Sequence, residues 1–200
     1  MTLDQFRPHV QGIVQPVVNL TRKLGITPNG LSVASFFVSI LAGIAFYAGG
    51  VMLGVVMVAL NAVFDALDGA LARDMGIASP RGDFLDHVID RYADIFIITG
   101  IFAGGAAPWP IGVFALTGVL MSSYLGTQAQ AVGVGRYYGG ILGRADRLLL
   151  IIIAGVLTIL IPGEIYGLNY LGWLLVIFGI FGHYTAFQRF VHVWRNIEDL

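Results

Sequence analysis

The sequence predicts an all-α, polytopic membrane protein with six transmembrane helices and an N-terminal interfacial amphipathic helix. Hydrophobic residues make up 57% of its 200 residues and charged residues 12%, about half the charged share of a soluble globular chain. Segments 24–64 and 95–135, each of 41 residues, carry no formal charge. A helix needs roughly 20 apolar residues to cross the hydrocarbon core, so each segment accommodates two helices. The placement of the basic residues, described below, supports the same count.

The composition also excludes several classes of protein. The apolar content excludes disordered and collagen-like chains, and the absence of cysteine excludes a disulfide scaffold and a cysteine zinc site. The formal net charge is −1, so no general basic field exists to hold nucleic acid, and we expect no nucleic-acid partner. Membrane lipids are the surroundings that this composition predicts.

The N-terminal segment is amphipathic rather than continuously apolar. Arg7, Pro8 and Pro16 interrupt the apolar run before it reaches the length of a secretory signal. Apolar and polar residues alternate over residues 6–20, which indicates an interfacial segment within residues 1–26; a partly ordered leader is the alternative. Thr27 and Pro28 then predict a helix start, with threonine as N-cap and proline at the first helical position. Residues 27–200 would form the six-helix bundle, and residues 1–200 a single domain.

Glycine and proline clusters divide the apolar segments into helices. They occur at residues 49–50, 104–110 and 162–163, where we expect turns. The predicted spans are 30–49, 51–73, 83–104, 110–132, 144–162 and 167–190.

All eleven basic residues fall at or near the termini, the connection between spans two and three or the connection between spans four and five, and none falls in the three opposite turns. They are Arg7, Arg22, Lys23, Arg73, Arg81, Arg91, Arg136, Arg144, Arg147, Arg189 and Arg195. By the positive-inside rule, both termini and these two connections face the cytoplasm. We therefore expect a multi-pass protein of the plasma membrane.

Four acids lie at the predicted cytoplasmic ends of spans two and three. Asp65 and Asp68 are three residues apart on one helix face, and Asp86 and Asp90 are four apart on another. Carboxylates that converge in this way repel one another unless cations or protons neutralise them. A ligand set made of oxygen favours Mg²⁺, Mn²⁺ or Ca²⁺ over zinc, and a pair of divalent ions would suit phosphoryl chemistry.

Simple ion pairing is the alternative explanation for the acids in this part of the chain. Under it, they pair with Arg73, Arg81 and Arg91. We expect such pairing for Asp74, Asp83 and Asp94. It is a poor explanation for the four converging acids, because three arginines cannot neutralise them and also serve the connection.

The spacing of these acids is more specific than any one of them. Residues 65–90 read D-x2-D-G-x2-A-R-x8-G-x3-D-x3-D, with defining positions Asp65, Asp68, Gly69, Ala72, Arg73, Gly82, Asp86 and Asp90. This pattern resembles the signature of the CDP-alcohol phosphotransferase family and matches it without a gap. The family's six-helix architecture agrees with the predicted spans, so the resemblance covers essentially the whole chain.

The resemblance implies a role for each of these positions. Asp65, Asp68, Asp86 and Asp90 would bind two Mg²⁺ or Mn²⁺ ions, and Asp90 would also accept the proton of the attacking alcohol. The residues implied in CDP-lipid binding are Pro28, Asn29, Gly30, Leu31, Asp65, Asp68, Gly69, Ala72, Arg73, Ser79 and Gly82. For Ser79 and residues 28–31, plain helix capping is the alternative. Since no motif in the sequence suggests a covalent nucleophile, direct displacement of CMP is the simplest mechanism.

The acceptor is predicted from the connection between spans four and five. Arg136, Arg144 and Arg147 flank glycines there and favour an acceptor that already carries a phosphate, with ordinary positive-inside anchoring as the alternative. The stretch resembles the family's archaeal branch, which joins CDP-archaeol to an inositol phosphate. It also resembles the family's actinobacterial branch, but departs from it at Gly126 and Gln128, where that branch has arginines.

Four questions stay open at this stage: the lipid donor, the acceptor, a non-enzyme role and the oligomeric state. CDP-diacylglycerol is the alternative lipid donor, and glycerol phosphate is the main rival acceptor. A transporter with Asp90 and Asp94 as a proton relay is the non-enzyme alternative, although such acids would more naturally lie at the bilayer midplane. A homodimer is compatible with the sequence.

We expect His87 to face another side of the helix from Asp86.

Overall fold

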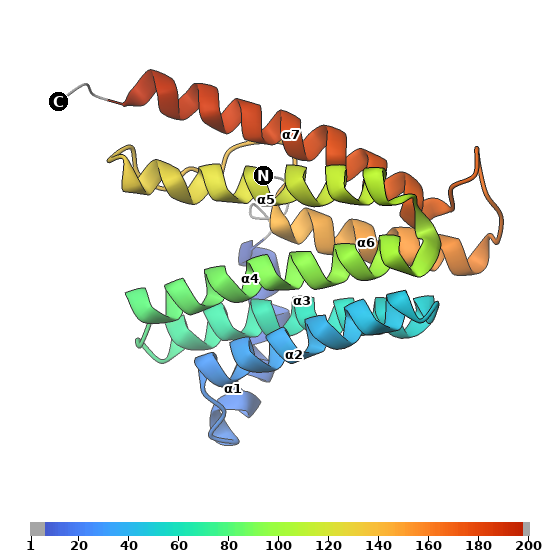
Figure 1. Cartoon of the computed structure of the whole chain (residues 1–200). Helices are drawn as coiled ribbons and strands as arrows, with labels where there is room; N and C mark the ends of the chain where they lie inside the picture. The colour runs from blue at the N-terminus through green and yellow to red at the C-terminus, as the bar shows by residue number, and fades with distance from the viewer. Residues whose placement is uncertain (1–6, 198–200) are drawn as a thin grey trace.

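The computed structural model describes residues 7–197, with side chains described from residue 15, and those residues form helices without strands (Figure 1). The helices are α1 (Arg7–Lys23), α2 (Pro28–Tyr47), α3 (Val51–Asp74), α4 (Pro80–Ile101), a π-helical turn η2 (Phe102–Ala106), α5 (Trp109–Ala131), α6 (Arg144–Leu160) and α7 (Tyr170–Asn196). Each of the six predicted spans coincides with one of the helices α2 to α7. The all-α prediction is confirmed for the described residues.

Local sequence signals set the helix boundaries. The Thr27 side chain accepts a hydrogen bond from Gly30 N at the start of α2, and Pro28 occupies the first turn, as predicted. Ser79 caps α4 in the same way through Gly82 N. The 49–50 turn is a true glycine turn, because Gly49 has φ +78°, a conformation that other residues rarely adopt.

Close helix crossings depend on pairs of glycines. A β carbon at Gly100 of α4 would lie 2.6 Å from the Cα of Gly43 on α2. One at Gly182 of α7 would lie 2.7 Å from the carbonyl carbon of Gly118 on α5. Small residues let helix backbones approach closely where no hydrophobic effect drives association within lipid. The bundle is therefore organised around the α2–α4 and α5–α7 crossings, and α6 packs against α3 and α7.

Four of the helices are long and apolar enough to cross a membrane: α2, α3, α5 and α7. The six-span count is thus supported in part. Helix α4 does not qualify as a membrane span by composition, because its N-terminal part is strongly charged. Its charged residues are Arg81, Asp83, Asp86, Asp90, Arg91 and Asp94. Helix α6 has 17 residues, about 26 Å at 1.5 Å per residue. Both helices contribute the charged residues described below.

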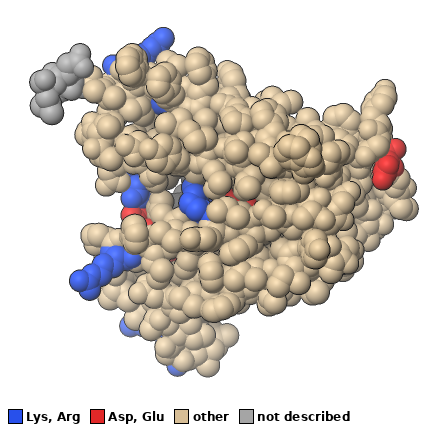
Figure 2. Space-filling view, viewed as in Figure 1, with Lys and Arg blue, Asp and Glu red and all other residues tan. Residues whose placement is uncertain are grey.

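Helix α1 lies across the other helices and packs against α3 (Figure 1). Its Val18 is buried with Leu31, Leu67 and Leu71, and Arg22 lies 3.5 Å from Asp74. A helix is therefore present in the N-terminal segment, while its interfacial position stays a prediction. Figure 2 shows Lys and Arg at the end where α3 turns into α4, basic and acidic atoms together in a hollow nearby, and a further acidic group at the opposite end.

Candidate active site

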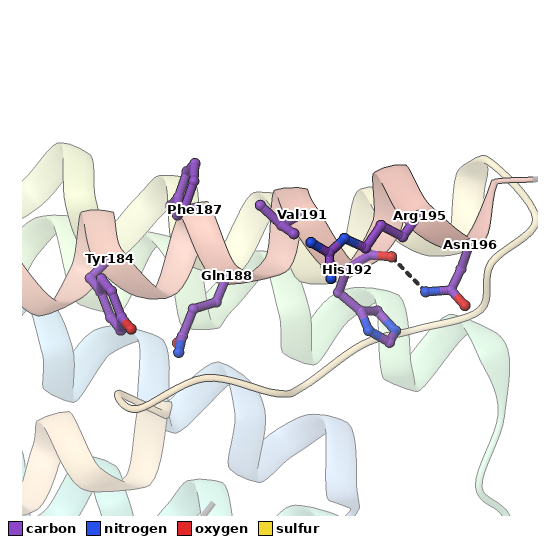
Figure 3. Close-up of a pocket in the computed structure, with 7 residues that line it drawn as sticks. All are labelled: Tyr184, Phe187, Gln188, Val191, His192, Arg195 and Asn196. Carbon is purple, nitrogen blue, oxygen red and sulfur yellow. Dashed lines mark hydrogen bonds between the residues drawn. The ribbon is translucent and has the colours of Figure 1, made fainter.

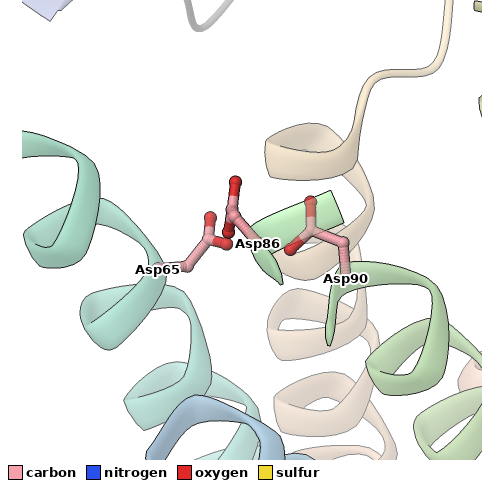
Figure 4. A group of neighbouring side chains, drawn as sticks. All are labelled: Asp65, Asp86 and Asp90. Carbon is pink, nitrogen blue, oxygen red and sulfur yellow. The ribbon is translucent and has the colours of Figure 1, made fainter. Parts of the chain in front are cut away.

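Three carboxylates converge between α3 and α4. Asp65 comes from α3, and Asp86 and Asp90 come from successive turns of α4, so the i, i+4 spacing places the last two on one face. One oxygen of each carboxylate lies within 4.8 Å of the others, and the three side chains point toward one another (Figure 4). Asp90 is 8% exposed, and its Oδ1 is buried without a hydrogen bond. The predicted convergence is therefore present for these three acids.

Asp68, the fourth predicted ligand, lies outside this group of three. It is buried one turn further along α3, and its Oδ2 accepts a hydrogen bond from Ser32 Oγ at 2.6 Å. Ser32 lies on α2, so this bond ties the two helices together beside the site. Sequence reasoning missed Ser32, because a serine inside an apolar helix carries no signal of its distant partner.

An arginine from α6 reaches into the acidic group. The Arg144 guanidinium lies 3.0 Å from Asp90, 3.5 Å from Asp65 and 3.8 Å from Asp94, measured between nitrogen and carboxylate oxygen. Its Nη1 also donates a hydrogen bond to the backbone oxygen of Asp90 at 2.7 Å. Arg144 therefore links α3, α4 and α6 at the site.

The other two arginines predicted to hold the acceptor phosphate already have carboxylate partners. Arg147 is 3% exposed, and its Nη2 donates to Asp94 at 2.8 Å. Arg136, in the 132–143 loop, makes two hydrogen bonds to Asp83, at 2.9 and 2.6 Å. This bond to the Asp83 carboxylate raises the pKa of Arg136, so the guanidinium stays charged.

The expected pairing of Asp74, Asp83 and Asp94 occurs, but mainly with other arginines. Asp74 pairs with Arg22 and Asp83 with Arg136. Asp94 lies closest to Arg147, at 2.8 Å, and 3.9 Å from Arg91. The prediction of Arg73 and Arg81 as partners was wrong, because the fold brings arginines from α1, α6 and the 132–143 loop closer than the local ones.

The residues predicted to bind CDP-lipid gather at the starts of α2 and α4. Pro28 and Leu31 are buried while Asn29 and Gly30 are exposed. A β carbon at Gly82 would lie 3.6 Å from Asn29 Oδ1 and 3.5 Å from Ser79 Oγ, so these two helix starts lie side by side. On α3, the Arg73 side chain folds back over Gly69. Arg73 and the partly exposed Ala72 lie near the end of that helix.

A cavity of about 100 Å³ opens beside the acids. Its lining residues are His87, Asp90, Arg91, Ser123, Gly126, Thr127, Tyr138, Gly143, Arg144, Arg147 and Arg189. His87 lines it together with Asp90, because residues three apart on a helix share a face. Asp86 is not among the lining residues, so the expectation that His87 faces another side of the helix from Asp86 is not contradicted. A larger hollow of about 580 Å³ runs along α7 (Figure 3) and contains none of the predicted site residues.

Arg189 is a cavity residue that sequence reasoning did not identify. It is 6% exposed, and it donates to the backbone oxygens of Gly139, Ser122 and Tyr138 at 2.8, 2.5 and 3.3 Å. It therefore fixes the loop before α6 against α5. From the sequence, Arg189 was counted only among the basic residues expected on the cytoplasmic side.

The chain matches known families and curated proteins over most of its length. Residues 25–183 match the family described as CDP-alcohol phosphatidyltransferase. Archaetidylinositol phosphate synthase of Pyrococcus horikoshii is 37% identical over 175 residues, covering 88% of this chain and 93% of the relative. The enzyme of the same name from Methanothermobacter thermautotrophicus is 30% identical over 196 residues, covering 98% and 96%.

The fold resembles solved structures of phosphatidylinositol phosphate synthase from Mycobacterium tuberculosis. The structure with CDP-DAG bound has a TM-score of 0.80 at 23% identity and covers 94% of this chain and 98% of that one. The structure in complex with manganese and citrate has a TM-score of 0.81 at 23% identity, covering 94% and 93%. At this identity the likeness establishes a shared fold.

Proposed function

Because the chain belongs to the CDP-alcohol phosphatidyltransferase family, we propose that it joins CDP-archaeol to an inositol phosphate and releases CMP. It is a membrane phospholipid synthase of the transferase class. The similarity to two archaetidylinositol phosphate synthases over most of both chains supports the choice of donor and acceptor. The site would face the cytoplasm, where the positive-inside rule places the connections rich in arginine.

The residues of the site fit divalent cations. Three carboxylates with oxygens within 4.8 Å of one another repel one another, and Arg144 supplies a single positive charge beside them, with its Nη2 at 3.0 Å from Asp90 Oδ1. Hard oxygen ligands suit Mg²⁺ or Mn²⁺. We propose that Asp65, Asp86 and Asp90, with Asp68 beside them, hold two such ions. When bound, the ions would supply charge stabilisation for the diphosphate and for the attacking oxygen. A related synthase has been solved with manganese, which agrees with this proposal.

The chain's own residues would divide the remaining work. Asp90 would accept the proton of the acceptor hydroxyl, since its carboxylate faces the cavity and a positioned base of this kind assists attack. Arg73 would bind the diphosphate, for which a guanidinium has suitable paired donors. Gly69 and Gly82 would leave room for the nucleotide beside the backbone. Pro28, Asn29, Gly30, Leu31, Ala72 and Ser79 would complete the CDP-lipid site.

The acceptor phosphate would lie in the arginine-lined cavity. Arg144 and Arg147 line this cavity, and Arg136 lies in the preceding loop. The observation that carries the proposal is this placement of arginines directly beside the acidic group, since it brings an anionic acceptor to the proposed base. The other acceptors to be weighed are glycerol phosphate and free inositol, and the other donor is CDP-diacylglycerol.

CMP release by the purified enzyme tests the proposal. Each donor, CDP-archaeol or CDP-diacylglycerol, is combined with inositol phosphate, glycerol phosphate or free inositol. We expect the highest kcat/KM with CDP-archaeol and inositol phosphate. A preference for free inositol would contradict the phosphate site, and a preference for glycerol phosphate would make the chain a glycerophosphate-type synthase. No CMP release from any pair would contradict the proposed substrates altogether.

A further inference from the structure

We propose that Arg144 couples the two halves of the site, because its guanidinium shares Asp65 and Asp90 with the divalent cations and can leave them for the acceptor phosphate. The proposal rests on the proposed function and adds a residue that sets the order and cooperativity of ligand binding. A bound cation would displace Arg144 from Asp65 and Asp90, and a bound phosphate would attract Arg144 away from them. Each ligand would therefore favour the position of Arg144 in which the other ligand binds more tightly.

The first observation is the position of the guanidinium. Arg144 approaches two of the three clustered carboxylates, at 3.0 Å from Asp90 and 3.5 Å from Asp65. Both carboxylates belong to the group of three that would hold a cation. A positive group held there lowers the affinity for cations, both by occupying ligand oxygens and by direct repulsion. Arg144 and the divalent ions are therefore competitors for Asp65 and Asp90.

The second observation is that Arg144 is held there incompletely. Its Nη1 donates to the backbone of Asp90, but Nε and Nη2, which lie 3.5 Å from Asp65 and 3.0 Å from Asp90, form no hydrogen bond of good geometry with these carboxylates. Unsatisfied buried donors are costly. Arg144 also lines the cavity proposed for the acceptor, so phosphate oxygens there could satisfy these N–H groups. A second, better-satisfied position is thus available to the side chain.

The neighbouring arginines are not equivalent to Arg144 in this respect. Arg147 donates to Asp94, an acid outside the group of three. Arg136 is bound twice to Asp83. Arg189 is bound to three backbone oxygens. Arg91 also lies 3.5 Å from Asp90, but among the cavity arginines of the described chain Arg144 alone contacts both Asp65 and Asp90.

Linkage gives a quantitative expectation. If phosphate draws Arg144 off Asp65 and Asp90, phosphate must tighten cation binding, and cations must tighten phosphate binding by the same factor. Removing the charge should by itself tighten cation binding. A unit charge a few Å from a divalent ion in water-like surroundings corresponds to roughly a tenfold change in affinity.

The first test is Mn²⁺ binding to the purified protein in lipid nanodiscs, followed by the electron paramagnetic resonance signal of free Mn²⁺. Arg144→Gln should lower the dissociation constant about tenfold, while Arg144→Lys, which keeps the charge, should stay close to the wild type. Arg22→Gln is the control, because Arg22 pairs with Asp74 outside the site, and it should change nothing. Unchanged or weaker Mn²⁺ binding in folded Arg144→Gln would overturn the proposal.

The second test needs no variant at Arg144 to fold. Inorganic phosphate should tighten Mn²⁺ binding to the wild type several-fold after correction for Mn²⁺–phosphate complexes in solution. The effect should be smaller in Arg144→Gln where that variant folds. No tightening in the wild type, or equal tightening in both proteins, would overturn the coupling. By contrast, Mn²⁺ binding that is absent in the wild type or intact in Asp65→Asn would contradict the proposed cation site itself.

Discussion

At the scale of single residues, Asp90 has the most demanding surroundings in the site. Its carboxylate is buried, lies close to two other acids and to Arg144, and faces the cavity. Repulsion from the acids and attraction to the arginine act on the same oxygens. This balance would suit the proposed roles of Asp90, which are to bind a cation and to receive a proton. Asp68 lies on α3 and accepts a hydrogen bond from Ser32 of α2, so its main contact holds two helices together.

Asp90→Asn should abolish turnover while CDP-lipid binding largely survives. Asparagine keeps the volume and one oxygen but cannot take a proton, and loss of a general base alone typically costs about 10²–10⁴-fold in rate. Loss of a cation contact should add to this. CMP release measures the rate of turnover, and an equilibrium binding assay measures whether the variant still binds the CDP-lipid. Asp65→Asn should instead weaken nucleotide and cation binding together, and a near-native rate for Asp90→Asn would contradict its role as base.

Asp94→Asn should destabilise the protein strongly. It leaves the buried Arg147 without its carboxylate, and breaking a buried pair typically costs about 3–5 kcal/mol. Thermal unfolding in detergent, followed by circular dichroism, measures the effect. Asp74→Asn is the matched control, because its partner Arg22 is well exposed and such pairs contribute about 0–1 kcal/mol. Equal unfolding temperatures for the two variants would contradict the structural role of the Asp94–Arg147 pair.

The acids of the site could be predicted from the sequence, and most of their partners could not. The positions of Asp65, Asp86 and Asp90 follow from the spacing of residues within one helix each, and this spacing can be read directly from the sequence. The hydrogen bonds from Arg144 to Asp90 and from Arg147 to Asp94 join residues 54 and 53 positions apart. Such contacts depend on how α4 packs near α6, and no local pattern encodes this. For that reason, the predicted partners Arg73 and Arg81 were wrong.

At the scale of helices, the boundaries follow capping signals and the crossings follow glycine. Thr27, Ser79 and Asn169 each accept a hydrogen bond from a backbone N–H in the first turn of their helix, and two of these starts also carry proline. These local signals made the helices predictable. Which glycines meet across a crossing was not predictable, because glycine occurs 27 times in the chain.

Gly100→Ala should loosen the α2–α4 crossing and destabilise the protein. The new β carbon would lie 2.6 Å from the Cα of Gly43, which forces a backbone shift, and overpacking of this kind typically costs about 1–3 kcal/mol. Thermal unfolding again measures the change. Thr99→Ala, the neighbouring position on the same helix, is the control and should have a smaller effect. A Gly100→Ala variant as stable as the wild type would show that the crossing has room to adjust.

At the scale of the whole molecule, the charged residues of α4 and α6 converge near one end of an apolar bundle. This arrangement predicts that activity is absent in excess EDTA and is restored by Mg²⁺ or Mn²⁺ but not by Zn²⁺, because the ligand set consists of hard oxygens. CMP release with each metal checks the expectation. Full turnover in excess chelator would contradict the cation site.

The membrane topology gives a sharper test of the whole arrangement, because the chain has no cysteine and single cysteines can be introduced cleanly. If all six helices α2 to α7 cross the membrane, Ile77 and Val132 lie on the cytoplasmic side, and Tyr47 and Ile165 lie outside. If only the four long apolar helices cross, Val132 moves to the outside with Ile165. All four side chains are exposed.

An impermeant maleimide applied to intact cells should therefore label Tyr47→Cys and Ile165→Cys but neither Ile77→Cys nor Val132→Cys. Labelling after permeabilisation shows that all four cysteines can react. The reason to expect six crossings is the one-sided distribution of arginine, together with an α6 length of about 26 Å from its 17 residues, close to the thickness of a hydrocarbon core. Labelling of Val132→Cys in intact cells would establish four crossings and would place the loop before α6, with the acceptor arginines, away from the cytoplasm.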